Sequence, residues 1–268
     1  TPDRLAAYAA TVVGHDTVGC ESGAHRTDRS PALSAFDATG YYVIRDGQDM
    51  LIADCGEVGP DYQPGHAHCD TLSYELALDG RRVIVDSGVH DYESGELRRY
   101  VRSTRAHNTV TVDGAEQSEV WGAFRVARRA RPLAVKLERL PEGVARFAGS
   151  QGGYARLPGR PIHARQIAYG PDGSWMVTDT VTGGGEHIVA SYIHLHPELA
   201  VQVNGNRVIL ARDSRPVAEI EVLHGARIEL EEGWYCPQFG LRQRNAVLKL
   251  SKSGMLPIVL GYRIAKRR

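Results

Sequence analysis

The chain has 268 residues, of which 42% are hydrophobic, and its 32 Lys and Arg residues balance 32 Asp and Glu residues. A chain of this length can bury one sizeable core, and its zero net charge gives no electrostatic reason to expect a nucleic-acid or membrane partner. No apolar run approaches the roughly 18 residues that a membrane span requires, and no targeting signal is visible.

In chain order, the sequence predicts one helical stretch followed by many short strands. Leu5–Ala10 is the only helical text in residues 1–25, which we treat as an N-terminal remnant that precedes a domain of residues 26–268. Apolar and polar residues alternate over residues 73–78 and 82–85, and Asp79-Gly80 joins these two segments, so the sequence predicts a β-hairpin. Residues 96–103 are predicted to be helical. Turn-forming residues separate the remaining predicted strands, which are residues 175–181, 188–195, 207–211, 218–223, 246–250 and 258–264, with turns at 171–173, 183–185, 204–206 and 253–254.

This pattern predicts an all-β protein, a large antiparallel β-sandwich of the supersandwich kind. No repeat, low-complexity tract or clear linker divides the chain. We interpret the break at residues 150–159 as a boundary between two sheets of one domain.

Histidines and acids concentrate between Gly65 and Gly114, which contain four of the 11 histidines. His66 and His68 are two residues apart, so on an extended strand both would point to the same face. Asp86 ends an apolar run, and His107 directly precedes another strand-like segment. Two imidazoles and one carboxylate, from His68, His107 and Asp86, can hold a zinc ion with its fourth position open. The residues alone also allow hydrogen-bonded histidines and a turn-forming Asp without a metal.

Several ordered blocks of this region resemble one enzyme family. They are Gly65-His66-Ala67-His68-Cys69-Asp70 followed by Leu72–Leu76, then Val85-Asp86-Ser87-Gly88 and Tyr92, then Arg102–Val110 and Asp113-Gly114. Together with Gly40–Arg45, they resemble the central β-sandwich of the heparinase II/III-like polysaccharide lyases, which include the oligoalginate lyases. The resemblance is strong over residues 34–130 and diffuse afterwards.

The resemblance implies roles for particular residues. Those that match the family's zinc ligands are His68, Asp86 and His107, and the residue that matches His66 faces the substrate cleft beside the catalytic groups. The family often has Tyr four residues after the zinc-binding Asp, where this chain has His90, with Tyr92 two residues later. Either of these two side chains would therefore reach the sugar. The resemblance also implies a mainly structural zinc ion.

The activity that the resemblance implies is β-elimination across a uronic acid of an acidic polysaccharide. Lyases of this family carry an (α/α) toroid before the sandwich, and the toroid supplies the proton-transferring Tyr and its partners. We therefore expect this chain to be the C-terminal half of such a lyase, with residues 1–25 as the end of a missing toroid and little activity without it. A periplasmic or secreted location follows from the resemblance alone.

Arginine, aromatic and cysteine residues add weaker indications. The chain has 28 Arg against 4 Lys, and guanidinium groups suit anionic sugars, although a GC-rich genome explains the same bias. Arg102 and Arg105 are the favoured substrate contacts. Trp121 and Trp234 are interpreted as core residues more readily than as sugar-stacking platforms. Cys69 adjoins the site and could replace a ligand, but a buried small hydrophobic side chain is the preferred interpretation.

Three functions are consistent with the sequence. The first is the lyase half described above. The second is a non-catalytic, zinc-stabilised module that binds glycan or packs against its neighbour. The third is a zinc hydrolase that uses metal-bound hydroxide, which only the open coordination position supports. An unsaturated product distinguishes the first from the other two.

Overall fold

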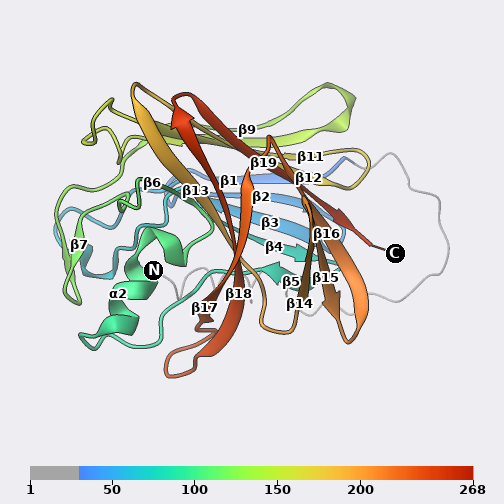
Figure 1. The fold of residues 1–268 in the computed structure, drawn as a ribbon, viewed down its shortest axis with the longest axis horizontal. Helices are drawn as coiled ribbons and strands as arrows, with labels where there is room; N and C mark the ends of the chain where they lie inside the picture. Colours follow the sequence, from blue (N-terminus) through green and yellow to red (C-terminus); the bar gives the residue numbers. More distant parts are fainter. Residues whose placement is uncertain (1–29, 268) are drawn as a thin grey trace.

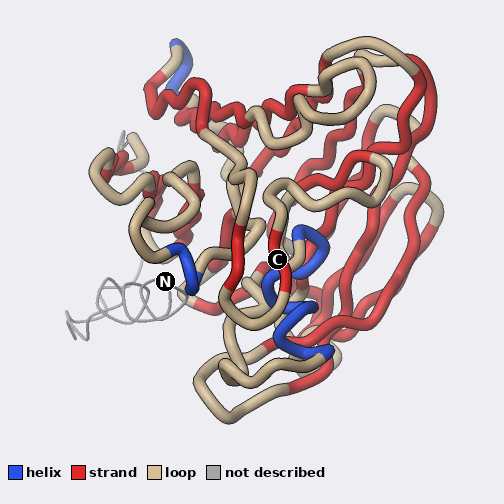
Figure 2. Tube along the Cα trace, turned by 90° about the vertical axis from the view of Figure 1, so that its left-hand side faces the viewer, coloured by secondary structure: helices blue, strands red, loops and turns tan. Residues whose placement is uncertain are grey.

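The computed structural model describes residues 30–267, and most of these form antiparallel strands. Figure 2 shows how short the helical segments are beside the strands. The helices are η1 (Pro64–His66), α2 (Glu96–Arg102), η2 (Thr104–Ala106) and η3 (Pro141–Gly143). The strands are β1 (Ala32–Phe36), β2 (Tyr41–Asp46), β3 (Asp49–Asp54), β4 (Tyr74–Leu78), β5 (Arg81–Ile84), β6 (Val110–Val112), β7 (Val120–Trp121), β8 (Arg125–Val126), β9 (Pro132–Arg139), β10 (Ala145–Gln151), β11 (Ile162–Tyr169), β12 (Trp175–Thr182), β13 (Glu186–His194), β14 (Ala200–Asn204), β15 (Arg207–Arg212), β16 (Arg215–Leu223), β17 (Arg227–Tyr235), β18 (Gln243–Met255) and β19 (Ile258–Lys266).

The strands form three larger sheets and one small ribbon. The five-stranded sheet has the order β1-β2-β3-β4-β5, the eight-stranded sheet β14-β15-β16-β19-β12-β11-β10-β9, and the four-stranded sheet β17-β18-β13-β6, while β7 pairs with β8. A bridge between Ile84 and Leu195 joins the ends of β5 and β13, so the five- and four-stranded sheets adjoin. In Figure 1, α2, β6 and β7 lie on the left and β14, β15 and β16 on the right. The predicted antiparallel β-sandwich is confirmed.

One apolar core holds these sheets together. Leu51 and Leu76 come from the five-stranded sheet, Phe147 and Val177 from the eight-stranded sheet, and Leu248 from the four-stranded sheet, and all are at most 1% exposed. Alternate residues of each strand point to this shared core, which is why a period of two dominates the sequence. The three larger sheets therefore share this core.

Local turn chemistry explains the elements that the sequence predicts correctly. Asp79 and Gly80 have positive φ angles of 50° and 73°, as a two-residue hairpin turn requires, and they join β4 to β5. The helix predicted at residues 96–103 is α2. Asn204–Asn206 likewise lies at the turn between β14 and β15.

Two predictions about strand breaks are wrong. Ser253 and Gly254 do not form a turn, because β18 continues through them and pairs with β13 as far as Met255. The break at residues 150–159 does not separate two sheets, because β10 and β11 on either side of it are hydrogen-bonded neighbours. Strand β17 was not predicted from the sequence; the carboxylates of its Glu229 and Glu231 lie 3.1 and 3.3 Å from Nζ of Lys249 on β18.

The helical turn predicted at Leu5–Ala10 and the remnant of residues 1–25 lie outside the described residues. Within residues 30–267, no helix has both the length and the apolar character that crossing a membrane would require.

Candidate functional site

The connection from β3 to β4 brings the first histidines to the site. Pro64 starts the 3₁₀ turn η1, which ends at His66, and the chain then becomes extended at Ala67. As a result His66 is exposed whereas His68 is only 3% exposed. The prediction that both histidines share one face of a strand is wrong, because the proline-initiated turn separates them.

His107 and Asp86 form a close pair. Asp86 follows β5, and its Oδ2 lies 2.6 Å from Nδ1 of His107, which caps η2. Burial alone would raise the pKa of Asp86 and lower that of His107, but their opposite charges and their hydrogen bond outweigh it. The pKa of Asp86 falls to about 2 and that of His107 rises to about 9. Asp86 therefore fixes the orientation of the imidazole.

The structure gathers His68, Asp70 and His107 into what we call the candidate metal group. One possible ligand atom from each residue lies within 4.8 Å of the other two. Nε2 of His107 is buried and has no hydrogen-bond partner. Two nitrogens and one carboxylate oxygen suit zinc, so the residues fit such an ion.

The carboxylate of this group differs from the predicted one. Asp86 was predicted as a ligand, but the carboxylate gathered with both histidines is that of Asp70, and Asp86 contacts Nδ1 of His107. A carboxylate behind a ligand histidine is a common arrangement around zinc. The sequence offered one signal for Asp70, since it lies two residues after His68.

Arg98 of α2 was missed by the sequence analysis and contacts the metal group directly. Its side chain is 1% exposed, and its Nη1 lies 3.3 Å from Nε2 of His68. Burial, followed by the charge of His107, lowers the pKa of His68 well below its usual range, so that imidazole is neutral and can accept this hydrogen bond. A metal bound through Nε2 of His68 would replace this hydrogen bond.

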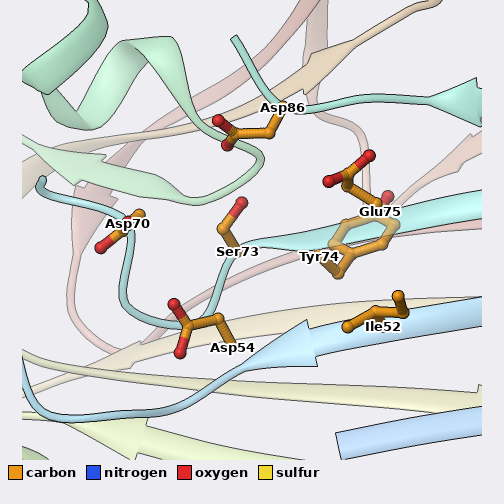
Figure 3. Close-up of a pocket in the computed structure, with 7 residues that line it drawn as sticks. All are labelled: Ile52, Asp54, Asp70, Ser73, Tyr74, Glu75 and Asp86. Atoms are coloured by element: carbon orange, nitrogen blue, oxygen red, sulfur yellow. The ribbon is translucent and has the colours of Figure 1, made fainter. Parts of the chain in front are cut away.

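Acidic side chains line a small pocket beside the metal group (Figure 3). The pocket is lined by Ile52, Asp54, Asp70, Ser73, Tyr74, Glu75 and Asp86. Burial is the main cause that raises the pKa of Asp54 and Asp70, and it raises the pKa of Glu75 to about 7. Such a pocket repels an anionic sugar, because its remaining carboxylates carry negative charge.

An aromatic cluster lies around His66. The ring of Tyr92 lies 4.9 Å from His66, 6.2 Å from Phe124 and 5.4 Å from Phe239, measured between ring centroids. Phe124 and Phe239 are 49% and 61% exposed. The guanidinium of Arg98 lies 5.2 Å from the Tyr92 ring centroid, where the cation stabilises the ring. An exposed wall of rings beside His66 is suited to packing against a sugar.

The remaining candidate substrate residues differ in how exposed they are. Arg105 is half exposed, and its Nη2 lies 3.7 Å from Oε2 of Glu231. His90 is partly buried, and its Nε2 lies 3.6 Å from Asp91. Arg102 is 1% exposed and donates hydrogen bonds to three backbone carbonyls. The geometry does not support the predicted substrate contact by Arg102, because its side chain is buried and holds loops together.

Two other predicted alternatives can be placed. Cys69 is buried, and burial raises the pKa of its thiol to about 12, so it remains protonated. Among the described residues it is not part of the metal group. The interpretation of the two tryptophans as core residues does not hold: Trp121 is 49% exposed, and Trp234 has Arg242 and Arg244 over its ring, at 4.9 and 3.7 Å from the centroid.

Comparison with known proteins identifies the family. The profile of the family described as "Heparinase II/III-like, C-terminal" matches residues 28–263. The chain belongs to this family. A curated relative of this heparinase II/III-like chain is a heparin-sulfate lyase of Pedobacter heparinus, which is 32% identical over 87 residues, or 30% of this chain and 13% of the relative.

Solved structures share this fold. Heparan sulfate lyase HepC from Pedobacter heparinus superposes with a TM-score of 0.71 at 19% identity, covering 99% of this chain and 41% of the other. A heparinase III superposes with a TM-score of 0.69 at 19% identity, covering 89% of this chain and 37% of the other. The heparinase II/III-like chain thus spans well under half the length of these relatives.

Proposed function

We propose that this chain is the sandwich portion of a polysaccharide lyase that cleaves a uronic-acid-containing polysaccharide by β-elimination, together with an (α/α) toroid. The observation that carries the proposal is the arrangement of an exposed His66 and an aromatic cluster directly beside a buried His/Asp group. The family assignment agrees with it. A periplasmic or secreted location suits a polymeric substrate of this kind.

In this mechanism the C5 proton of the uronic acid must be removed and the C4–O4 bond broken. A base takes the proton, the electron pair of the C5–H bond forms the C4=C5 double bond, and O4 leaves with the C4–O4 pair and is protonated by an acid. His66 would contact the sugar at this centre, either to orient it or to stabilise the charge that develops on the C6 carboxylate. Tyr92, Arg105 or His90 would hold the neighbouring sugar. The toroid would supply the other proton-transfer groups.

A zinc ion would be held by His68, Asp70 and His107, with Asp86 behind His107. When bound, such an ion supplies a fixed positive charge that ties the loops of the site together. Because the three ligands would come from two separate segments of the chain, the ion would join those segments, which agrees with the mainly structural role that the family resemblance implies. The exposed His66 lies at the end of one of those segments.

The assay for lyase activity is the ultraviolet absorbance of the unsaturated product. We expect it to rise when a longer protein that joins this chain to a toroid acts on a uronic polymer, and to stay flat with this chain alone. Products without a double bond would indicate a hydrolase. Lack of any product, with retained binding of oligosaccharide, would favour the second candidate, a glycan-binding module, which the exposed aromatic cluster supports.

Zinc content distinguishes the two possible carboxylate ligands. Asp70→Asn should abolish stoichiometric zinc binding, whereas Asp86→Asn should keep zinc with an affinity reduced about 10- to 100-fold, as for a residue that orients a ligand. Elemental mass spectrometry and competition with a chelator measure both effects. The reverse order would make Asp86 the ligand, as the sequence predicted. A folded wild type that takes up no zinc would exclude the metal.

A further inference from the structure

A buried ionic network lies beneath the candidate site, on the side of the eight-stranded sheet. Arg165 of β11 and Asp179 of β12 stand directly opposite each other in the strand pairing, and both side chains are fully buried. Arg165 donates Nε and Nη2 to the two carboxylate oxygens of Asp179, at 2.7 and 2.8 Å. His163 and Ser191 contact the same carboxylate at 2.8 and 2.9 Å. The carboxylate is therefore fully engaged and holds the guanidinium plane in one orientation.

This orientation points the remaining nitrogen of Arg165 at two loops of the site. Nη1 donates to the carbonyl of Leu72 at 2.7 Å and also to the carbonyl of Asn108. Leu72 ends the segment of residues 68–72, which carries His68 and Asp70, and Asn108 directly follows His107. One nitrogen atom thus joins the two chain segments from which the candidate metal group is built.

Leu72, which accepts one of these hydrogen bonds, has an unusual backbone conformation. Leu72 has a φ of 68°, in the left-handed region that a side chain of this kind rarely adopts. Such a conformation persists only where surrounding contacts enforce it, and it occurs often at functional sites. Gly149 of β10 pairs with Arg165 of β11, and its lack of a side chain leaves room for Leu72. A Cβ at Gly149 would lie only 2.5 Å from Cδ2 of Leu72.

We propose that Arg165, oriented by Asp179, is a positioning residue that fixes the 68–72 and 107–109 segments relative to each other. Lysine could not replace it, because only a planar guanidinium can pair with a carboxylate through two nitrogens and still direct a third to two carbonyls. The consequence for the proposed function is that metal affinity depends on a residue of another sheet. The inference rests on the proposed function only for that consequence.

Amide hydrogen exchange tests the positioning role without a metal or substrate. The Leu72 amide donates to the carbonyl of Asp54, and the Thr109 amide donates to that of His107, so both report on opening of their segments. Arg165→Lys should speed exchange at least about tenfold in residues 68–72 and 107–109 while strands β17 and β18 exchange as in the wild type. Val177→Ala is the matched control, because it removes a fully buried side chain two residues from Asp179 without removing a hydrogen bond.

Unchanged exchange in both segments, or equal acceleration by the control, would overturn the proposal. Should Arg165→Lys not fold, the double substitution Arg165→Met with Asp179→Leu leaves no buried charge of this pair unmatched and removes the same carbonyl contacts. It is expected to show the same selective acceleration.

Zinc affinity provides the second measurement. Arg165→Lys should bind zinc about 10- to 100-fold more weakly than the wild type, and Val177→Ala with wild-type affinity. If Arg165→Lys bound zinc with wild-type affinity, the contacts of Arg165 with the two segments would have no effect on the candidate metal group. Failure of the wild type itself to bind zinc would refute the metal site, while the exchange result would still decide whether Arg165 positions the two segments.

Discussion

Replacement of Asn108 by Ala should destabilise the whole sandwich, because this side chain connects three parts of the fold. Asn108 is fully buried next to His107. Its Nδ2 donates to the carbonyls of Tyr74 and Val85 at 2.8 and 2.9 Å, and its Oδ1 accepts from the amide of His194 at 2.6 Å. The substitution therefore leaves three buried backbone groups without a partner.

The expected loss follows from those three groups. A buried polar group that loses its only partner costs about 1–3 kcal/mol, so Asn108→Ala should lower the free energy of unfolding by roughly 3–6 kcal/mol, allowing for some relaxation. For a domain of this size that corresponds to a fall in Tm of roughly 6–24 °C. Asn108→Asp should cost at least as much, because a carboxylate oxygen would face two carbonyl oxygens.

Urea and thermal unfolding followed by circular dichroism measure this loss. Asn206→Ala is the control, since Asn206 is an exposed residue whose side chain makes one hydrogen bond, to Val222 at 3.3 Å. Its effect should stay below about 1 kcal/mol. A loss of less than about 1 kcal/mol for Asn108→Ala would refute the view that this side chain supports the fold beside His107.

Three further predictions concern the site and the network beneath it. His68→Ala should remove zinc and lower stability, whereas His66→Ala should keep zinc and impair turnover in the toroid-containing protein, as measured by metal content and product absorbance; loss of zinc from His66→Ala would contradict the assignment. Asp179→Asn should lower stability near pH 7 by about 3–5 kcal/mol, because it leaves Arg165 buried without its counter-charge. Burial raises the carboxyl pKa of Asp179, but the charge of Arg165 outweighs burial and depresses that pKa. The carboxylate therefore stabilises the fold above the usual pKa of Asp, and this stabilisation is lost as the pH falls below that value towards the depressed pKa. Urea midpoints measured from about pH 3 to about pH 7 should thus vary less in Asp179→Asn than in the wild type. Phe239→Ala should weaken oligosaccharide binding roughly three- to tenfold with little change in Tm, and unchanged binding in a titration would remove this ring from the substrate wall.

The sequence correctly placed Asp86 and His107 next to strand ends. The run before Asp86 becomes β5, and the segment after His107 leads into β6, so both residues occupy the predicted positions. His68 and His107 come together as expected. Position along a strand is a local property, and alternation together with turn residues encodes it.

The sequence did not determine which of two similar nearby side chains takes part in the candidate site. Whether Asp70 or Asp86 joins the two histidines depends on how the β3–β4 connection folds after Pro64, and spacing alone does not specify that path. Arg98 and Arg102 look alike in the sequence and both donate to backbone carbonyls, yet Arg98 also reaches His68 whereas the hydrogen bonds of Arg102 all go to carbonyls. The direction of a long side chain depends on which partners the fold places around it.

The sequence by itself determined the class of fold, the hairpin at Asp79-Gly80 and the segments that hold the site. These depend on the period of apolar residues and on backbone preferences, which act over a few neighbouring residues. Only the tertiary structure decided that Arg165, more than fifty residues from His107 in the chain, supports the loops of the site. The Arg165–Asp179 pair forms within the eight-stranded sheet, but its contacts with the carbonyls of Leu72 and Asn108 arise only when segments distant in the sequence pack together.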